Sequence, residues 1–263
     1  MGMKTWRYLG NALRFLQILY FLRFRFFSAT RSLLKFRQGL GIGNNIYKIS
    51  VRFQEISKSI DKLIYGDFVA LEFGSGSSTI LLYSHPRVSR LISIEEDRRF
   101  LPSIRVTAKE WISPELTIKK IDWHGYQSKV FSDANRYTAV ADLIYIDGPS
   151  TNRNDSLELA EPNLELLLFE GLADKLILID CRTLTVCELS RKLEDSHQLI
   201  PSKAVLREYG TFLSGKKEFQ YFKFMSERGL RLAEDALGFY PIRTSILVPK
   251  KQISSYLLEA RRR

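Results

Sequence analysis

Residues Val69 to Thr79, with the sequence VALEFGSGSST, combine a carboxylate, two glycines and several hydroxyls at the end of a short apolar run. A run with β-branched and aromatic members, followed at once by glycines, predicts a buried strand that turns sharply into a helix. Gly74 and Gly76 would let the backbone approach a ligand closely, because glycine accepts positive φ and has no Cβ. Free N–H groups at the start of the next helix would add donors for a cofactor. The pattern predicts a cofactor-binding turn, although the same glycine spacing also occurs in ordinary tight turns.

A second carboxylate, Glu95, follows the next apolar run, Arg90 to Ile94, and lies 21 residues beyond Gly74. In nucleotide-binding βαβ units, an acid about 20 residues after the glycines accepts the ribose hydroxyls. Taken singly, Glu72 and Glu95 could equally cap helices. Their order and their spacing together favour cofactor binding.

Aspartates also follow three later apolar runs: Asp122 comes after 116–121, Asp147 after 141–146 and Asp180 after 175–179. Because the carboxyl ends of parallel strands meet at one edge of a sheet, these acids should converge on one site. His124 is the histidine expected at this edge, and its imidazole could act as a catalytic base near neutral pH. His85 directly precedes a proline and is expected in a surface turn. Each aspartate could instead be an ordinary turn former at the end of a strand.

The elements that must position these residues alternate along the chain. Residues 46–65 repeat apolar side chains at intervals of three and four, which predicts a helix leading into the glycine stretch. Strands are expected at 88–94, 116–121, 141–146 and 175–179, with a helix at 98–111. This alternation predicts a doubly wound, mostly parallel α/β sheet with helices on both faces. In the C-terminal third, the apolar segments 204–206, 219–225 and 242–248 predict strands that complete the sheet.

Composition indicates one main domain preceded by a basic arm. The chain has 263 residues, of which 45% are hydrophobic, and a net charge of +11. Ten basic residues precede the first acid, Glu55, whereas the rest of the chain is nearly neutral. We therefore divide the chain into an arm, 1–45, with a glycine-rich hinge at its end, and a domain, 46–263. The two cysteines, Cys181 and Cys187, suggest no disulfide framework, which favours a reducing cytoplasm.

Residues 4–37 of the arm mix these basic residues with large aliphatic and aromatic side chains. The longest apolar run, between Gln17 and Arg23, is far shorter than the roughly 20 residues that span a membrane. We expect an amphipathic helix on an anionic membrane surface, which would make the protein peripheral at the inner face of the membrane. The helix could instead pack on the domain or on a second subunit. Nucleic acid is not expected as a partner, because aliphatic bulk interrupts the basic residues.

Four segments, LEFGSGSST, LISIEED, ADLIYIDGP and LILIDCRT, resemble the successive motifs of class I S-adenosylmethionine-dependent methyltransferases. The likeness is greatest to a branch of small-molecule and sugar O-methyltransferase-like proteins, and it runs from about residue 63 to about residue 189. It implies the Rossmann-like methyltransferase fold, with S-adenosylmethionine as the cofactor.

The resemblance also implies a role for each motif residue. The implied cofactor contacts are Glu72, Gly74, Ser75 and Gly76 at the methionine part, Glu95 at the ribose hydroxyls, and Asp122 near the adenine amine. Asp147 would face the sulfonium methyl group and the acceptor. As a catalytic residue it could orient the acceptor hydroxyl or take its proton, directly or through His124. Ser78 stands where the family usually has a third glycine.

One departure from the family concerns metal ions. In metal-dependent catechol-type relatives, the aspartate after the fourth strand works with an acidic or amide pair after the fifth, and here that pair is Asp180-Cys181. Magnesium prefers oxygen ligands, so we expect no catalytic metal. The predicted function is O-methylation of a small-molecule or saccharide acceptor at a membrane surface. The alternatives are a nicotinamide-dependent oxidoreductase and a catalytically inactive, membrane-peripheral scaffold.

Overall fold

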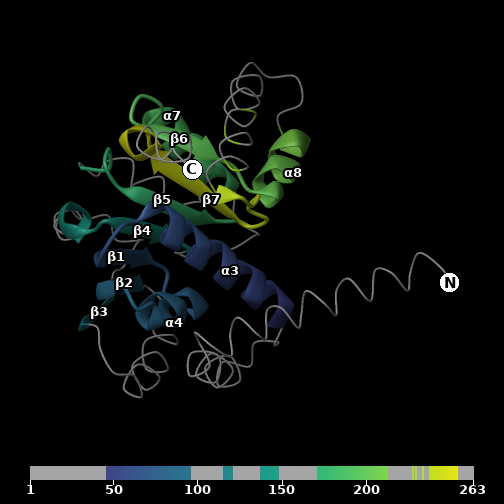
Figure 1. The fold of residues 1–263 in the computed structure, drawn as a ribbon. Coiled ribbons are helices and arrows are strands. Elements are labelled where there is room, and N and C mark those ends of the chain that lie inside the picture. The colour runs from purple at the N-terminus through teal and green to yellow at the C-terminus, as the bar shows by residue number, and fades with distance from the viewer. Residues whose placement is uncertain are drawn as a thin grey trace.

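The computed structural model describes residues 46–95, 115–120, 137–147, 171–212, 227, 229, 233 and 237–253. Within these ranges, seven strands form one sheet in the order β3-β2-β1-β4-β5-β7-β6 (Figure 1). Their bounds are β1 Phe68–Phe73, β2 Val88–Glu95, β3 Glu115–Lys120, β4 Leu143–Ile146, β5 Leu176–Asp180, β6 His197–Ile200 and β7 Thr244–Pro249. The expected arm, 1–45, and the expected helix at 98–111 lie outside the described residues.

The order of the strands confirms the doubly wound, mostly parallel sheet. It runs outward from β1 in both directions, to β2 and β3 on one side and to β4 and β5 on the other. These five strands pair in parallel, so their carboxyl ends share one edge. β7 confirms the strand expected at 242–248, and it is antiparallel to both β5 and β6.

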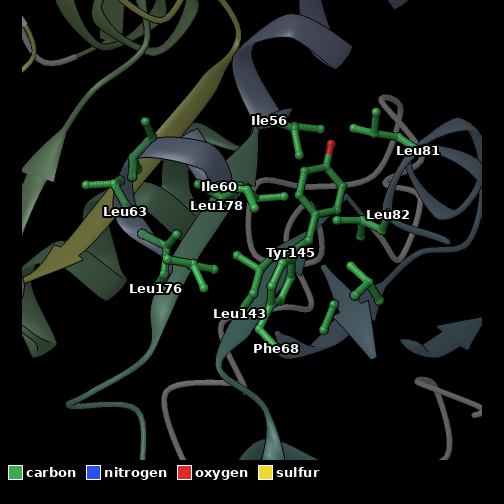
Figure 2. Packing of buried hydrophobic residues seen from close by; sticks show 14 of the residues in the cluster. Ile56, Ile60, Leu63, Phe68, Leu81, Leu82, Leu143, Tyr145, Leu176 and Leu178 are labelled. Carbon is green, nitrogen blue, oxygen red and sulfur yellow. The ribbon is translucent and has the colours of Figure 1, made fainter. Parts of the chain in front are cut away.

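Helices in the described ranges cover the sheet on both faces. Because side chains alternate along a strand, each central strand supplies apolar residues to two separate cores. Helices α3 (Ile46–Leu63) and α4 (Ser77–Ser84) pack on one face, where Ile56, Ile60 and Leu82 surround the ring of Tyr145 from β4 (Figure 2). Helices α7 (Thr183–Lys192) and α8 (Lys203–Phe212) contribute to the core on the opposite face.

The central strands read as near-continuous apolar runs because both of their faces are covered. Every residue of β4 and β5 is buried, and so are most residues of β1. Two charged side chains nevertheless lie inside these runs, Glu72 in β1 and Asp180 at the end of β5. Buried carboxyl groups are costly unless they are paired, so both positions need specific partners.

In the C-terminal third, the structure corrects one expectation and adds one strand that was not expected, while the strand expected at 219–225 lies outside the described residues. The segment 204–206, predicted as a strand, lies in α8, whose first turn is capped by a hydrogen bond from the backbone N of Val205 to Oγ of Ser202 (3.3 Å). The strand β6, which the sequence did not predict, begins with His197 and Gln198, and both are buried. These polar side chains concealed the apolar pattern that predicts a strand.

Among the helices of the described ranges, none combines the length and the hydrophobicity needed to cross a lipid bilayer. The membrane-binding segment expected at residues 4–37 lies outside these ranges.

Candidate active site

The glycine turn joins the ends of three neighbouring strands. Gly74 directly follows β1 and has φ of 88°, a conformation that strongly favours glycine. Its backbone N donates to the carbonyl of Ile94 near the end of β2 (2.9 Å), and the backbone N of Asp147 donates to the carbonyl of Phe73 (2.8 Å). The glycine turn, the end of β2 and the aspartate after β4 therefore lie side by side at the carboxyl edge, as expected.

Gly76 lies at the start of α4 with open space beside it. Its φ of 175° is extended, so conformation does not require glycine here. A Cβ added at this position would meet no atom within 4 Å, so the protein itself does not need the missing side chain. Its backbone N donates to Oγ1 of Thr79 (2.7 Å), and the neighbouring Ser75 forms a buried hydroxyl pair with Ser93 (2.6 Å). Hydrogen bonds to neighbouring residues thus fix the turn, and the space beside Gly76 leaves room for close approach of a ligand. This arrangement fits the expected cofactor.

Glu72 stabilises the glycine turn through hydrogen bonds to three hydroxyl groups. Its fully buried carboxylate accepts hydrogen bonds from the hydroxyls of Ser78 (2.5 Å), Thr79 (2.6 Å) and Ser93 (2.7 Å). Burial raises the pKa of Glu72 to about 7, against the opposing effect of the three hydroxyls. Because both oxygens face the protein, Glu72 shapes the turn. The direct contact with the methionine part of the cofactor stays a prediction.

Arg52 of α3 connects the two aspartates at the ends of β4 and β5. Its Nη1 donates to Oδ2 of Asp147 (2.9 Å) and its Nη2 to Oδ1 of the same carboxylate (3.4 Å). Nη2 also donates to Oδ2 of Asp180, whose side chain is only 1% exposed. Burial is the largest single effect on Arg52 and lowers its pKa. The attractions of Asp147, Tyr145 and Cys181, together with the hydrogen bond to Asp147, outweigh burial, so the pKa of the guanidinium is raised above its ordinary value. A planar guanidinium is suited to such bidentate pairing.

A second arginine approaches the same buried aspartate from the loop before β7. Nη2 of Arg243 lies 3.5 Å from Oδ2 of Asp180. Glu55, one turn after Arg52 on α3, accepts hydrogen bonds from the backbone N–H groups of Ile242, Arg243 and Thr244. Burial raises the pKa of Glu55, against the opposing effect of these N–H groups. These contacts fix α3 and the start of β7 against the ends of β4 and β5.

The sequence did not single out Arg52, Glu55 or Arg243. A signal was present for the first two, which lie next to the apolar stripe of a predicted helix and three residues apart, so both can face the domain. Arg243 directly precedes the apolar run of β7 and offered no comparable signal. The aspartates were predicted from their own strands, whereas their cationic partners come from distant segments.

The geometry also bears on a possible metal site. Within the described residues, no group of three or more His, Cys, Asp or Glu side chains is placed to hold a metal ion. Between Asp147 and Asp180 lies the guanidinium of Arg52. Cys181, the second member of the pair after β5, has φ of 49° and directs its Sγ toward the carbonyl of Arg243 (3.7 Å).

The structure describes only some of the remaining candidate residues. Glu95 is the last residue of β2, adjacent to the glycine turn, and its backbone alone is described. Asp122 and His124 lie outside the described residues. His85, expected in a surface turn, is instead buried, with Nε2 3.5 Å from Oδ1 of Asp61. The ring of Phe68 packs against it at 5.6 Å between centroids, which accounts for the burial.

No family model matches the sequence, and no curated protein matches it. Similar solved structures include the O-methyltransferase TomG from Streptomyces achromogenes, involved in tomaymycin synthesis and crystallised with SAM. It is 12% identical, with 88% of this chain and 94% of that chain covered and a TM-score of 0.43. The N-methyltransferase NodS from Bradyrhizobium japonicum WM9, in complex with S-adenosyl-L-homocysteine, is 11% identical, with coverages of 65% and 88% and a TM-score of 0.41.

The topology of the chain itself decides the fold. Five parallel strands wind outward from β1, an antiparallel β7 is inserted between β5 and β6, and a glycine turn follows β1. The chain therefore has the Rossmann-like methyltransferase fold.

Proposed function

We propose that this protein is an S-adenosylmethionine-dependent methyltransferase that transfers the methyl group to an oxygen atom of a small-molecule or saccharide acceptor. The observation that carries the proposal is the pair of backbone hydrogen bonds at the carboxyl edge. One joins Gly74 to Ile94 near the end of β2 (2.9 Å), and the other joins Asp147 to Phe73, the last residue of β1 (2.8 Å). One ligand lying across this edge could reach all three strand ends.

The residues at this edge have distinct tasks in the proposed reaction. The bound cofactor would supply an activated methyl group on a sulfonium. The turn from Gly74 to Gly76 would admit the methionine part closely, Glu95 would accept the ribose hydroxyls, and Asp122 would lie near the adenine. Asp147 would orient the acceptor. Methyl transfer needs the two reactants aligned at close range, so holding them in place is the main task of the protein.

Gly76→Ala tests the cofactor site without disturbing the fold. A methyl group in the open space beside Gly76 should leave the melting temperature nearly unchanged, since the backbone is extended and no atom lies within 4 Å. The same methyl group would occupy space that the cofactor needs. We expect affinity for S-adenosylhomocysteine, measured by titration calorimetry, to fall at least about tenfold, or about 1.4 kcal/mol.

Gly66→Ala provides a matched control. Gly66 precedes β1 at the opposite edge of the sheet and has φ of 71°, with no atom within 4 Å of an added Cβ. This variant should lose stability, because alanine is strained at positive φ, yet bind S-adenosylhomocysteine like the wild type. Binding of nicotinamide dinucleotides in place of S-adenosylhomocysteine would favour the oxidoreductase. Binding of neither would favour the inactive scaffold.

The membrane-surface location rests on the sequence of residues 4–37. If these residues bind anionic lipid, the full chain should co-sediment with vesicles that contain phosphatidylserine, and binding should fall as salt screens the charges. Deletion of residues 1–38 should abolish this binding. If the shortened chain binds the vesicles equally well, the lipid affinity comes from another part of the protein.

A further inference from the structure

The charges that a ligand can reach at the carboxyl edge are mainly positive. Arg243 and Arg52 have side chains that are 28% and 16% exposed, and Asp147 has a side chain that is 26% exposed. Asp180 is 1% exposed and Glu55 is also buried, so neither carboxylate faces an incoming molecule. An acceptor approaching this part of the edge therefore meets two guanidinium groups and one carboxylate.

The carboxylates at this edge whose side chains the structure describes are already bound by donors. Both oxygens of Asp147 accept from Arg52, and Oδ2 of Asp180 accepts from Arg52 and Arg243. Oδ1 of Asp180 has no hydrogen-bond partner but is fully buried. Glu72 is bound by three hydroxyls. A neutral hydroxyl acceptor needs a base to take its proton, and none of these groups stands free for that task.

From this arrangement we infer that the atom methylated is a carboxylate oxygen, so that the acceptor is a carboxylic acid and the product its methyl ester. The inference rests on the proposed methyltransferase function and specifies its acceptor. A guanidinium pairs with a carboxylate through two parallel hydrogen bonds. The side chain of Arg243 is 28% exposed and that of Arg52 is 16% exposed, so Arg243 is the more accessible of the two guanidinium groups. Arg243 is the residue that the geometry assigns to acceptor recognition.

The chemistry of the step agrees with the absence of a free base among these described groups. The carboxylate oxygen forms a bond to the methyl carbon while the carbon–sulfur bond breaks and its electron pair passes to sulfur. No proton leaves the acceptor, because a carboxylate is already ionised at neutral pH. One negative and one positive charge disappear in the step, and a site that excludes water favours such a loss of charge.

The first test measures binding with a matched pair of probes, benzoate and benzamide, which differ in charge but little in shape. Full-length protein saturated with S-adenosylhomocysteine should bind benzoate more tightly than benzamide in calorimetry at constant ionic strength. Arg243→Gln should weaken benzoate binding about 10–100-fold, the range expected for hydrogen bonds to a charged group. Arg243→Lys should bind with intermediate affinity, because it keeps the charge and loses the paired donors.

Arg191→Gln serves as the control, since Arg191 is exposed on α7 and pairs with Glu188. It should leave the affinity for benzoate unchanged. Melting temperatures with and without S-adenosylhomocysteine show whether each variant is folded. Equal affinity for the two probes, or unchanged benzoate binding in folded Arg243→Gln, would overturn the inference.

The second test identifies the bond that is formed, whichever molecule serves as the acceptor. Full-length protein is incubated with methyl-labelled S-adenosylmethionine and a heat-treated cell extract, and the product is exposed to mild base. A methyl ester releases volatile labelled methanol, whereas a methyl ether or a methylamine keeps its label. Volatile label supports the inference, while a base-stable product, or no product from protein that binds S-adenosylhomocysteine, contradicts it. Failure of the protein to bind S-adenosylhomocysteine would instead refute the methyltransferase proposal itself.

Discussion

Replacing Arg52 by glutamine should lower the free energy of unfolding by about 3 kcal/mol. Removing one member of a buried ion pair leaves the other charge buried and uncompensated, which typically costs about 3–5 kcal/mol. Asp180 is the charge left behind, with 1% of its side chain exposed. The expected loss lies at the lower end of this range because Arg243 still lies 3.5 Å from Asp180. Urea unfolding followed by circular dichroism measures the difference.

A second substitution distinguishes lost charge pairing from lost packing. Asp180→Asn removes the buried charge, so Arg52→Gln combined with Asp180→Asn should regain more than half of the lost stability. Arg191→Gln, at an exposed position, should change stability by less than about 0.5 kcal/mol. If the double variant is as unstable as Arg52→Gln alone, the loss comes from packing of the Arg52 stem and the ion-pair account is wrong.

Local patterns predicted the parts of the site that lie within single strands and their turns. The apolar runs that end at Asp147 and Asp180 were sufficient to place both aspartates at one edge, because parallel strands end together. Gly74 was predicted to need a glycine conformation, and its φ of 88° confirms it. Each of these predictions depends on residues that lie close together in the sequence.

The contacts that the sequence could not predict join distant segments. Arg52 pairs with a carboxylate 95 residues away, and Glu55 binds backbone groups 187 to 189 residues away. Such pairs depend on how α3 and β7 dock on the sheet. In the sequence alone, a charged residue beside an apolar stripe is equally consistent with a side chain that faces solvent. His85 shows the same limit, since a turn before a proline predicts exposure and its packing on Phe68 buries it.

These unpredicted contacts change the chemistry that the predicted residues can perform. Asp147 read alone is a candidate base, whereas Asp147 bound to Arg52 forms one side of a charged pair at the edge where the acceptor is expected. The same guanidinium connects β4 to the buried end of β5. The ion pairs therefore describe the site better than the aspartates alone do. We expect the two arginines to determine which acceptor the site prefers.

Glu72 should make the stability of the wild-type protein fall as pH rises from about 4.5 to about 7. Burial raises the pKa of this carboxyl to about 7 in the folded protein, compared with an ordinary value of 4.5. The folded state then binds the proton more tightly than the unfolded state does, so the stabilisation is complete below pH 4.5 and is lost as pH passes through 7. A difference of about 2.5 pKa units corresponds to roughly 3 kcal/mol.

Glu72→Gln should remove this contribution, because an amide does not ionise in this range. The free energy of unfolding of the variant, measured by urea denaturation at intervals from pH 4.5 to pH 8, should fall by about 3 kcal/mol less than that of the wild type. Glu55, whose pKa is also raised by burial, is present in both proteins, so their difference isolates Glu72. Glu194→Gln, at an exposed position after α7, should reproduce the wild-type curve. Parallel curves for the wild type and Glu72→Gln would show that Glu72 ionises in the folded protein as easily as in the unfolded chain, and that its three hydroxyl partners fully offset its burial.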